Sequence, residues 1–320
     1  MTPHNMDQCG APIRVHLDTD FRGDPDDACA LAMLLGWPGV EIVGITTSLD
    51  RLGLRAAYAI HLLNIVGRGH IPVAAGAALS MTTLAPADPV IRDERHWPLD
   101  TLARPSPPGA AVDLLMTSID AGATVVSIGP YTNLAQLEVM RSGTLTRASV
   151  VLMGGWVDPP GRDLPAWGPE MDFNVQSDTR AAEIVTASAG ELTLATLSAT
   201  FGATLRAVDL PRLRASGPMG ALLASQSQAF GLDNGMAKLG RSHAGLPDDL
   251  VNVQWDPVTC AVAVGWSGVT IEVMRLAPTT RGGVLRFERD ERGRPVRVVT
   301  VVNGESFRQV WIAAIEAAQH

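Results

Sequence analysis

The residues best suited to chemistry are five aspartates that fall within ten positions near the start of the chain: Asp18, Asp20, Asp24, Asp26 and Asp27. Carboxylates this close repel one another, and burying them is unfavourable unless a positive charge lies among them. A bound hard cation would supply that charge. Because no pair of Cys or His residues accompanies the aspartates, their oxygen donors favour calcium or magnesium over zinc.

The flanking sequence predicts how these carboxylates are positioned. Apolar residues 13–17 predict a strand that ends at Asp18, and an amphipathic pattern predicts a helix that begins near Asp26. Ligands of α/β folds bind at the carboxyl ends of the strands, where the aspartates would lie. Asp26 and Asp27 would also lie in the first helical turn, where free N–H groups and the helix dipole favour negative charge. Capping would account for these two aspartates but not for the other three.

Along the rest of the chain, short β-branched runs alternate with segments of helical period. Strands are predicted at residues 13–17, 41–47, 71–74, 124–128, 149–153 and 192–197, and helices at 26–35, 51–66, 110–121, 133–140 and 178–189. This alternation predicts an α/β fold, a single domain over residues 1–320 with a mostly parallel central sheet flanked by helices. Two turn signals within residues 269–302 predict a C-terminal β-hairpin at the sheet edge, before a helix at 306–318. Residues 84–108 and 154–169 are predicted to be long loops, which are often functional.

Composition limits the class of protein. The chain has 320 residues, of which 46% are hydrophobic and 18% charged, so it can bury a large core. A net charge of −8 without any Lys/Arg-rich run argues against nucleic acid or an anionic membrane as partner. No apolar stretch has bilayer-spanning length, no signal-peptide pattern opens the chain, and three scattered cysteines fit a reducing compartment. We therefore expect a cytoplasmic protein.

Seven motifs, taken together in order and spacing, resemble the nucleoside N-ribohydrolase family. They are Asp18-Thr19-Asp20 with Asp26-Asp27-Ala28, Val43-Gly44-Ile45-Thr46-Thr47, Gly129-Pro130-Tyr131-Thr132-Asn133, Val151-Leu152-Met153-Gly154-Gly155, Asp172-Phe173-Asn174, Asp256-Pro257 and Thr280-Arg281-Gly282. The similarity spans essentially the whole chain. It implies one domain with a Rossmann-like core, a tightly bound Ca²⁺, hydrolysis of the N-glycosidic bond of a ribonucleoside, and a homo-oligomer, either a dimer or a tetramer.

The resemblance also implies a metal centre. Asp20 would be both metal ligand and general base, while Asp27, Asp256 and the backbone carbonyl of Thr132 would complete the protein ligands. Cleavage of a ribosyl C1′–N bond passes through an oxocarbenium-like state and needs an activated water, a grip on the ribose and help for the departing base. Calcium would lower the pKa of a bound water and orient the ribose.

Ribose binding is implied for a second group of residues. Asp26 would hold a ribose hydroxyl, and Asp172 and Asn174 would hold the rest of the sugar. The spacing from Asp20 to the aspartate pair is two residues longer than in the commoner form of the motif, so Asp24 is an alternative to Asp26. Many members carry Glu where this chain has Asp172.

The base pocket departs most from the family pattern. Trp255 stands directly before Asp256, where many relatives have a His that protonates the departing base. An indole cannot be a general acid, but it can stack on a purine ring and favour protonation of that ring. This arrangement resembles the purine-specific inosine-adenosine-guanosine branch, in which a second tryptophan sandwiches the base and an aspartate ends the second strand. Trp97 and Asp50 would take those two places.

Each base-pocket residue has a simpler alternative. Trp255 could be a core residue, Trp97 a packing anchor in its Pro-rich loop, and Asp50 a cap for the helix at 51–66. Trp156 and Trp167 are reserve candidates for the second stacking tryptophan. Two loop histidines, His96 and His243, could protonate the base or simply be solvated, and His16 is predicted to be a satisfied core residue.

Two other functions fit parts of the sequence. A strand followed by Asp18-Thr19-Asp20 also opens phosphatases of the haloacid dehalogenase type, but Arg22 replaces their usual Thr or Val, and the sole lysine, Lys238, lacks a strand beside it. A calcium-dependent nucleoside or sugar binding protein without catalytic activity is the other alternative. Only a hydrolase would release free ribose from inosine.

Overall fold

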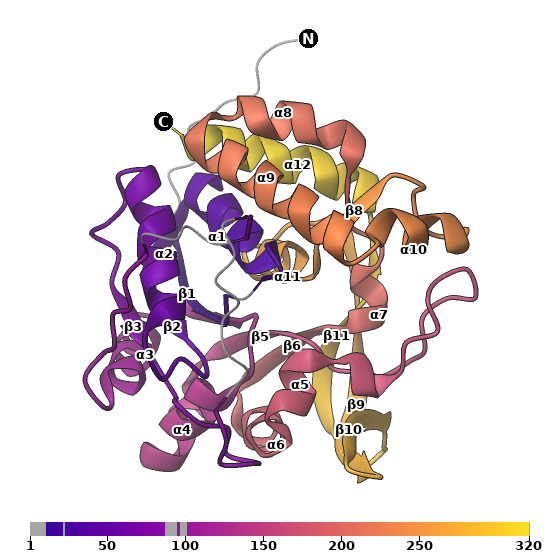
Figure 1. Ribbon diagram of the computed structural model, residues 1–320. Coiled ribbons are helices and arrows are strands. Elements are labelled where there is room, and N and C mark those ends of the chain that lie inside the picture. Colours follow the sequence, from indigo (N-terminus) through magenta and orange to yellow (C-terminus); the bar gives the residue numbers. More distant parts are fainter. Residues whose placement is uncertain (1–10, 22, 87–94, 97–100, 320) are drawn as a thin grey trace.

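The computed structural model describes residues 11–21, 23–86, 95–96 and 101–319. Its centre is a nine-stranded sheet with helices on both faces (Figure 1). The strands lie in the order β10-β9-β11-β6-β5-β4-β1-β2-β3. Their bounds are β1 (Ile13–Thr19), β2 (Val40–Thr47), β3 (Val73–Ala75), β4 (Thr124–Ser127), β5 (Ser149–Met153), β6 (Glu191–Ala195), β9 (Val269–Arg281), β10 (Val284–Arg289) and β11 (Arg294–Val302). A separate antiparallel pair consists of β7 (Thr204–Arg206) and β8 (Leu250–Val253).

The sheet is mostly parallel, as the alternation of strand and helix patterns predicts. Strands β1 to β6 and β11 are joined by parallel pairings, whereas β9 pairs antiparallel with both β10 and β11. The predicted C-terminal hairpin is confirmed: β9 and β10 form it around Gly282 and Gly283, both of which have positive φ. It extends the sheet beyond β11.

Helices cover both faces of the sheet. They are α1 (Asp26–Gly36), α2 (Leu54–Ile65), α3 (Ala110–Asp120), α4 (Thr132–Met140), α5 (Phe173–Ser177), α6 (Thr179–Ser188), α7 (Leu197–Thr200), α8 (Leu210–Ala215), α9 (Gly217–Asp233), α10 (Met236–Ser242), α11 (Trp255–Ala263) and α12 (Gly304–Ala317), with short 3-10 turns η1 (Leu145–Arg147), η2 (Pro169–Met171) and η3 (Ala207–Asp209). Within the described ranges, none of these helices combines the length and apolar character needed to cross a membrane.

Two hydrophobic cores lie on opposite faces of the sheet. Helices α1, α2, α9, α11 and α12 contribute to one core, and α3, α4 and α6 to the other. Successive residues of a strand point to opposite faces, and Val126 accordingly belongs to the first core while its neighbour Val125 belongs to the second. The central strands β1, β4, β5 and β6 are therefore buried on both sides, as expected for parallel strands.

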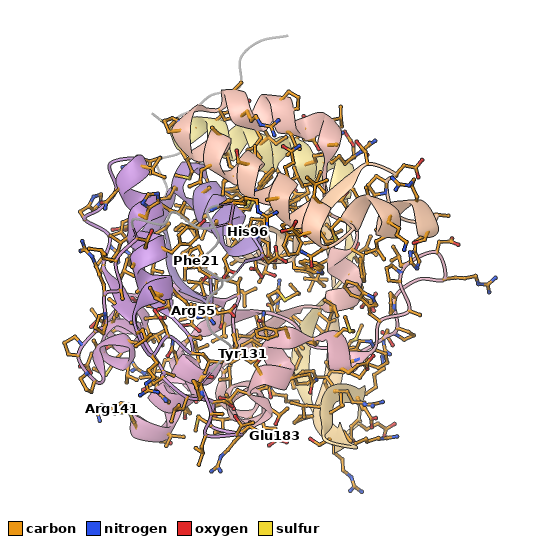
Figure 2. The ribbon with its side chains drawn as sticks, in the orientation of Figure 1. Phe21, Arg55, His96, Tyr131, Arg141 and Glu183 are labelled. Carbon is orange, nitrogen blue, oxygen red and sulfur yellow. The ribbon has the colours of Figure 1, made fainter. Side chains whose placement is uncertain are left out.

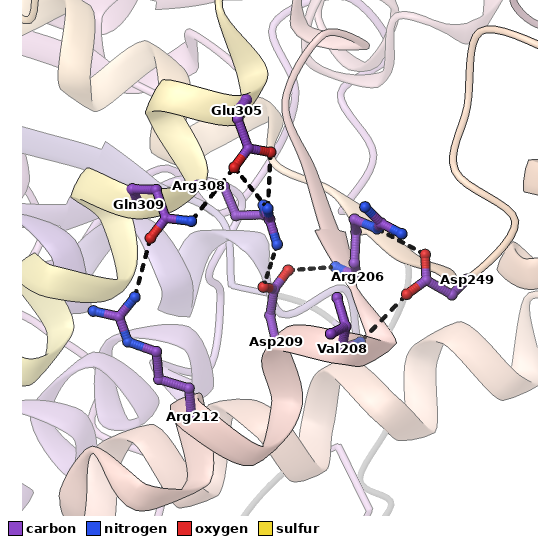
Figure 3. A network of polar contacts seen from close by, with 8 residues as sticks. All are labelled: Arg206, Val208, Asp209, Arg212, Asp249, Glu305, Arg308 and Gln309. Atoms are coloured by element: carbon purple, nitrogen blue, oxygen red, sulfur yellow. Dashed lines mark hydrogen bonds and ion pairs between the residues drawn. The ribbon is translucent and has the colours of Figure 1, made fainter.

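A polar network fastens the C-terminal helix to the rest of the fold (Figure 3). The Arg308 guanidinium on α12 donates to Asp209 of η3 at 2.6 Å and to Glu305 at 2.8 Å. Beside it, Arg206 donates through its side chain to Asp249 at 2.8 Å and through its backbone N–H to Asp209 at 3.2 Å. These contacts tie α12 to the β7–β8 pair, and α8, α9 and α12 lie together in Figure 1.

The order in which strands are added to the sheet switches sides at β1, and this topology predicts where a ligand would bind. Strand β1 lies between β4 and β2, so the connection to β2 leaves on one side and the later β4 lies on the other. Parallel α/β sheets bind ligands outside the carboxyl ends of their strands at such a switch point. Asp20, Asp24, Asp26 and Asp27 follow β1 directly, and Asp18 lies within it.

Candidate active site

A cavity of about 550 Å³ lies beyond the carboxyl end of β1. Many of the residues predicted to do chemistry line it, namely Asp20, Asp24, Asp26, Asp27, Asp172, Asn174, Trp255 and Asp256. They come from the loop after β1 and from the first turns of α1, α5 and α11, or directly precede those turns. The volume suits a small organic molecule.

Three buried carboxylates form the closest acidic group of the cavity. Oxygens of Asp26, Asp27 and Asp256 all lie within 4.8 Å of one another. Asp26 and Asp27 lie in the first turn of α1 and Asp256 in the first turn of α11, so the positive ends of two helix dipoles converge on this group. The arrangement matches the predicted pairing of Asp27 with Asp256 and adds Asp26 to it.

The electrostatics of this group fit a cation. Burial, followed by repulsion from neighbouring aspartates, raises the pKa of Asp26 and of Asp256 well above the usual value for a carboxyl. Burial also raises the pKa of Asp24 to about 6. Ionisation of all three carboxylates in this buried place is energetically unfavourable unless a counter-ion lies among them. Clustered hard oxygen donors match a divalent cation of the calcium or magnesium type.

The predicted general base, Asp20, lies beside this group without belonging to it. Its backbone N–H donates to the Asp27 Oδ1 at 3.1 Å, and its Oδ2 lies 3.5 Å from the guanidinium of the buried Arg55. Arg55 also donates to the backbone carbonyls of Asp20 and Phe21. The buried Arg55 guanidinium, labelled in Figure 2, therefore holds the turn after β1 and the Asp20 carboxylate in place.

The loop after β4 packs directly against Asp20. A Cβ atom at Gly129 would lie only 2.8 Å from the Asp20 Cβ, so glycine permits this approach. Thr132 begins α4, and its hydroxyl donates to Asp178 at 2.8 Å. Its side chain is therefore occupied, and the assignment of its backbone carbonyl as a ligand stays a prediction.

Asp18 belongs to a separate, enclosed network. It does not line the cavity, and its carboxylate accepts hydrogen bonds from Thr46 (2.6 Å), Asn133 (2.7 Å), Ser127 (3.0 Å) and Ser48 (3.2 Å). Burial raises its pKa to about 6 against the effect of these donors. His16 bonds to Ser118 and Thr46, and burial lowers its pKa to about 3, so it is the satisfied core residue that the sequence predicts. Asp18 therefore joins β1, β2, β4 and α4 behind the site.

The residues predicted to hold ribose are rigidly supported. Asp172 accepts from the backbone N–H of Gly155 at 2.6 Å and of Val175 at 3.3 Å, which caps α5, and burial raises its pKa to about 6. The Asn174 amide nitrogen donates to the carbonyls of Ile128 and Met153 at 3.0 and 3.2 Å. These bonds leave the amide oxygen of Asn174 for a molecule in the cavity.

Asp24 is held on the same side of the cavity by a residue that sequence reasoning missed. Its Oδ1 accepts from the Asn252 side chain at 2.8 Å and from the Asp26 N–H at 3.3 Å. Asn252 lies on β8, a strand that the sequence patterns did not reveal. Asp26 thus lies within the carboxylate group, while Asp24 lies beside it with a side-chain partner.

An aromatic pair lines another part of the cavity. The rings of Trp255 and Trp167 are stacked with centroids 6.4 Å apart and an interplanar angle of 26°, and Trp167 also contacts Phe201. The Trp255 Nε1 is buried and has no hydrogen-bond partner among the described residues. Trp97, preferred in the sequence analysis, lies outside the described residues, so Trp167 is the second tryptophan that the structure brings to Trp255.

The structure places Asp50, predicted to bind the base, at the start of α2. Asp50 does not line the cavity, and its Oδ2 accepts from the Thr47 hydroxyl and the Ala56 N–H, each at 2.9 Å. Ala56 lies in the first turn of α2, so the carboxylate satisfies a free N–H there. The geometry favours the helix-capping alternative.

Several cavity residues were not assigned from sequence. They are Ile128, Met153, Met171, Phe173, Leu197, Phe230, Asp233 and Asn234. The last three come from the end of α9 and the turn after it, where no helix was predicted because α9 buries polar residues such as Gln226 and Ser227 along with apolar ones. His96, one of the two loop histidines considered, also lines the cavity, whereas His243 does not.

Comparison with known proteins identifies the family. The model of the inosine-uridine preferring nucleoside hydrolase family matches residues 15–309. The chain belongs to this family. It is an enzyme of the glycosidase class that acts on N-glycosyl compounds, which rules out the phosphatase alternative. Enzymes of this family are metal-dependent, in keeping with the buried acidic group.

Individual relatives agree with this assignment. The pyrimidine-specific ribonucleoside hydrolase RihA of Salmonella typhimurium is 33% identical over 219 residues, which cover 64% of this chain and 68% of that protein. Among solved structures, a purine-preferring ribonucleoside hydrolase from Gardnerella vaginalis has a TM-score of 0.77 and 21% identity, covering 96% of this chain and 99% of that one. The plant nucleoside hydrolase PpNRh1 has a TM-score of 0.76 and 23% identity, covering 95% and 99%. At these identities the solved structures support the fold alone.

Because the cavity holds buried carboxylates with raised pKa values, we expect the stability of this nucleoside hydrolase to depend on pH and on a divalent cation. The pKa of Asp24 and of Asp172 is raised from 3.8 to about 6, so folding favours their protonated forms. That contribution is complete below about pH 4 and is lost as pH rises through about 6. We expect chelator-treated protein to have a higher Tm at about pH 5 than at pH 7.5. Calcium at one hundred times its Kd should restore about 2.7 kcal/mol at pH 7.5.

Differential scanning fluorimetry across this pH range, with and without Ca²⁺, measures both effects. Potassium chloride at matched ionic strength is the control for screening. The expected dependence would be contradicted if the Tm of the chelated protein rose with pH. It would also be contradicted if calcium left the Tm unchanged at pH 7.5.

Proposed function

We propose that this chain hydrolyses the N-glycosidic bond of purine ribonucleosides with the help of a bound Ca²⁺, releasing the free base and ribose. One observation carries the proposal: a single cavity of nucleoside size is lined both by clustered buried carboxylates and by a stacked pair of tryptophans. The carboxylates suit a cation and the ribose hydroxyls, and the indoles suit a flat base.

The cation would be held by Asp27 and Asp256, with Asp20 and the Thr132 carbonyl as further ligands. Asp26, whose carboxylate lies within 4.8 Å of theirs, would hold a ribose hydroxyl beside the cation. The hard oxygen donors and raised carboxyl pKa values of this group support this choice of site. When bound, the cation would supply a Lewis acid that favours ionisation of water and orients the ribose diol.

The protein groups would carry the remaining steps. Asp20 accepts the proton of the attacking water, and Arg55 holds its carboxylate in place. Asn174 and Asp172 bind ribose hydroxyls, with Asp24 on the same side. As the C1′–N bond breaks, positive charge grows on the ribose, and the surrounding carboxylates stabilise it.

The preference for purines rests on the aromatic pair. Trp255 and Trp167 provide a broad π surface, and a two-ring base covers more of it than a pyrimidine does. A pyrimidine preference is the second candidate, because the RihA relatives are named pyrimidine-specific. Asp50 also does not line the cavity, so one of the features that resembled the purine-specific branch does not support the purine preference.

A reducing-sugar assay tests the function and the base preference together. Inosine, guanosine, adenosine, uridine and cytidine are compared with and without chelator. We expect ribose release from the purine nucleosides to be fastest and to stop when the cation is removed. Faster release from uridine would establish the pyrimidine alternative, and binding of inosine without ribose release would indicate a non-catalytic binding protein.

Asn174→Ala is expected to lower kcat/KM for inosine by about 5- to 30-fold, because one buried hydrogen bond to the sugar is worth on the order of 1 to 2 kcal/mol. Steady-state kinetics and the Tm measure the effect. Asn64→Ala, which removes an exposed amide on α2, is the matched control. Unchanged kinetics of Asn174→Ala on ribonucleosides would remove Asn174 from the sugar site.

A further inference from the structure

A buried aspartate outside the cavity, Asp178, lies between α5 and α6 and accepts five hydrogen bonds. Its Oδ1 accepts from the Ala181 N–H at 3.2 Å and from the Thr82 N–H and hydroxyl at 3.1 and 2.8 Å. Its Oδ2 accepts from the Met81 N–H and from the Thr132 hydroxyl, both at 2.8 Å. The turn after β3, the first residue of α4 and the start of α6 therefore meet at one side chain.

Helix capping explains only one of these bonds. The Ala181 N–H belongs to the first turn of α6, and a cap at Asp178 satisfies it. The other four donors come from outside α6, and they satisfy the remaining lone pairs of a fully buried carboxylate, which would otherwise be costly to bury. Of the two hydroxyl donors, Thr82 is exposed and Thr132 is fully buried. Asp178 therefore holds a buried residue of another helix besides capping its own.

The loop that leads from β4 to Thr132 forms part of the cavity wall. Ile128 lines the cavity, and its carbonyl accepts from the Asn174 amide at 3.0 Å. Gly129 packs against Asp20, where a Cβ atom would come within 2.8 Å of the Asp20 Cβ. A shift of this loop would therefore be felt by the predicted general base and by a predicted ribose-binding residue.

Hydrogen bonds from four different elements or loops hold the end of this loop, one residue after another. The Pro130 carbonyl accepts from the Ser48 hydroxyl (2.7 Å), the Tyr131 hydroxyl donates to the Met153 carbonyl (2.8 Å), the Thr132 hydroxyl donates to Asp178 (2.8 Å), and the Asn133 amide donates to Asp18 (2.7 Å). Thr132 and Asn133 are thus held by two buried aspartates from separate parts of the chain. Such bonding fixes the direction of the backbone at the start of α4.

We propose that Asp178 is a positioning residue of the cation site. Through the Thr132 hydroxyl it holds the start of α4 so that the Thr132 backbone carbonyl is presented to the cation. This rests on the proposed function, in which that carbonyl is a ligand together with Asp27 and Asp256. Groups that orient metal ligands from behind typically contribute about 10- to 100-fold to metal affinity. Asp178 itself does not line the cavity.

Two threonine variants separate this role from a structural one. Thr132→Val and Thr82→Val each remove a hydroxyl bond of 2.8 Å to the same carboxylate and keep the backbone carbonyl. Isothermal titration of chelator-treated protein with Ca²⁺ measures the Kd in the absence of substrate. Thr132→Val should weaken calcium binding by about 10-fold, whereas Thr82→Val, the matched control, should leave the Kd within about twofold.

A double variant tests whether Asp178 acts through Thr132. In Asp178→Asn a donor nitrogen replaces one carboxylate oxygen, so the side chain can no longer accept all five bonds. We expect this variant to bind calcium about as weakly as Thr132→Val. The double variant should bind calcium no more weakly than Asp178→Asn alone, because the second change removes a bond that is already lost. Saturating calcium should restore kcat of Thr132→Val for inosine to within about twofold.

The other outcomes overturn the assignment. An unchanged calcium Kd for Thr132→Val, equal weakening by both threonine variants, or additive losses in the double variant would mean that Asp178 only supports the fold. If the unmodified protein binds no calcium, the cation site fails and the role of Asp178 fails with it. If Thr132→Val alone of the two threonine variants weakens calcium binding but no nucleoside is cleaved by the unmodified protein, the positioning role stands and the proposed hydrolysis fails. The two threonine variants decide the question even where Asp178→Asn does not fold.

Discussion

Asp20→Asn is expected to lower kcat for ribonucleosides by about 10³-fold. The amide keeps the size of the carboxylate but cannot accept the proton of the attacking water. Stopped assays of ribose release over a range of inosine concentrations measure kcat and KM separately. KM should change little, because the proton is transferred only in the transition state.

A second substitution at the same position separates the roles of base and ligand. Asp20→Ala should lose calcium binding together with activity, whereas Asp20→Asn should keep part of the calcium-dependent rise in Tm. Asp248→Asn, at an exposed position, is the matched control. Comparable turnover by Asp20→Asn and the unmodified enzyme would show that the base is another residue of the cavity. Tm values report whether Arg55 tolerates the loss of its neighbouring charge.

The acidic part of the site could be predicted because its geometry is local. Asp26 and Asp27 follow a strand and open a helix, and that pattern alone directs them to the carboxyl edge of the sheet. Asp256, more than two hundred residues later, was found only through its motif. Its place beside Asp27 depends on the packing of α11 against α1, which no local pattern encodes.

Asp18 and Asp50 show why residue type and spacing alone were insufficient. Both resemble site residues in sequence, yet both carboxylates are occupied by protein donors. The donors to Asp18 lie between 28 and 115 positions away in the chain, so they are visible only in the folded structure. Asp50 accepts a hydrogen bond from the nearby Ala56 N–H, so its carboxylate serves the helix start. Its position just before the predicted helix had already suggested this alternative.

The aromatic part of the cavity was harder to predict for a related reason. Loop residues such as Trp167 have no periodicity that indicates which way they face, and helix α9 has no clear apolar stripe because it buries Gln226 and Ser227. No sequence pattern therefore indicated that Phe230 and Asp233 line the cavity. Trp255 was predictable because it adjoins the Asp256-Pro257 motif.

Trp255→Ala is expected to lower kcat/KM for inosine by roughly 10- to 100-fold. Stacking of a base on an aromatic side chain is worth about 1 to 3 kcal/mol by alanine substitution, and each 1.36 kcal/mol is a factor of ten. The loss should be much smaller for p-nitrophenyl riboside, whose departure does not depend on protonation of a stacked base. Steady-state kinetics on both substrates measure the difference.

Because Trp255 also packs against Trp167, its removal could act through the fold, and the controls must separate the two effects. Trp255→Phe keeps an aromatic face and should recover most of the activity on inosine, while Trp37→Ala removes an indole outside the cavity and should leave the substrate ratio unchanged. Equal losses on both substrates would make Trp255 a packing residue. A larger loss on uridine than on inosine would instead indicate that the indoles select pyrimidines, which would reverse the base preference while leaving the cation and ribose assignments intact.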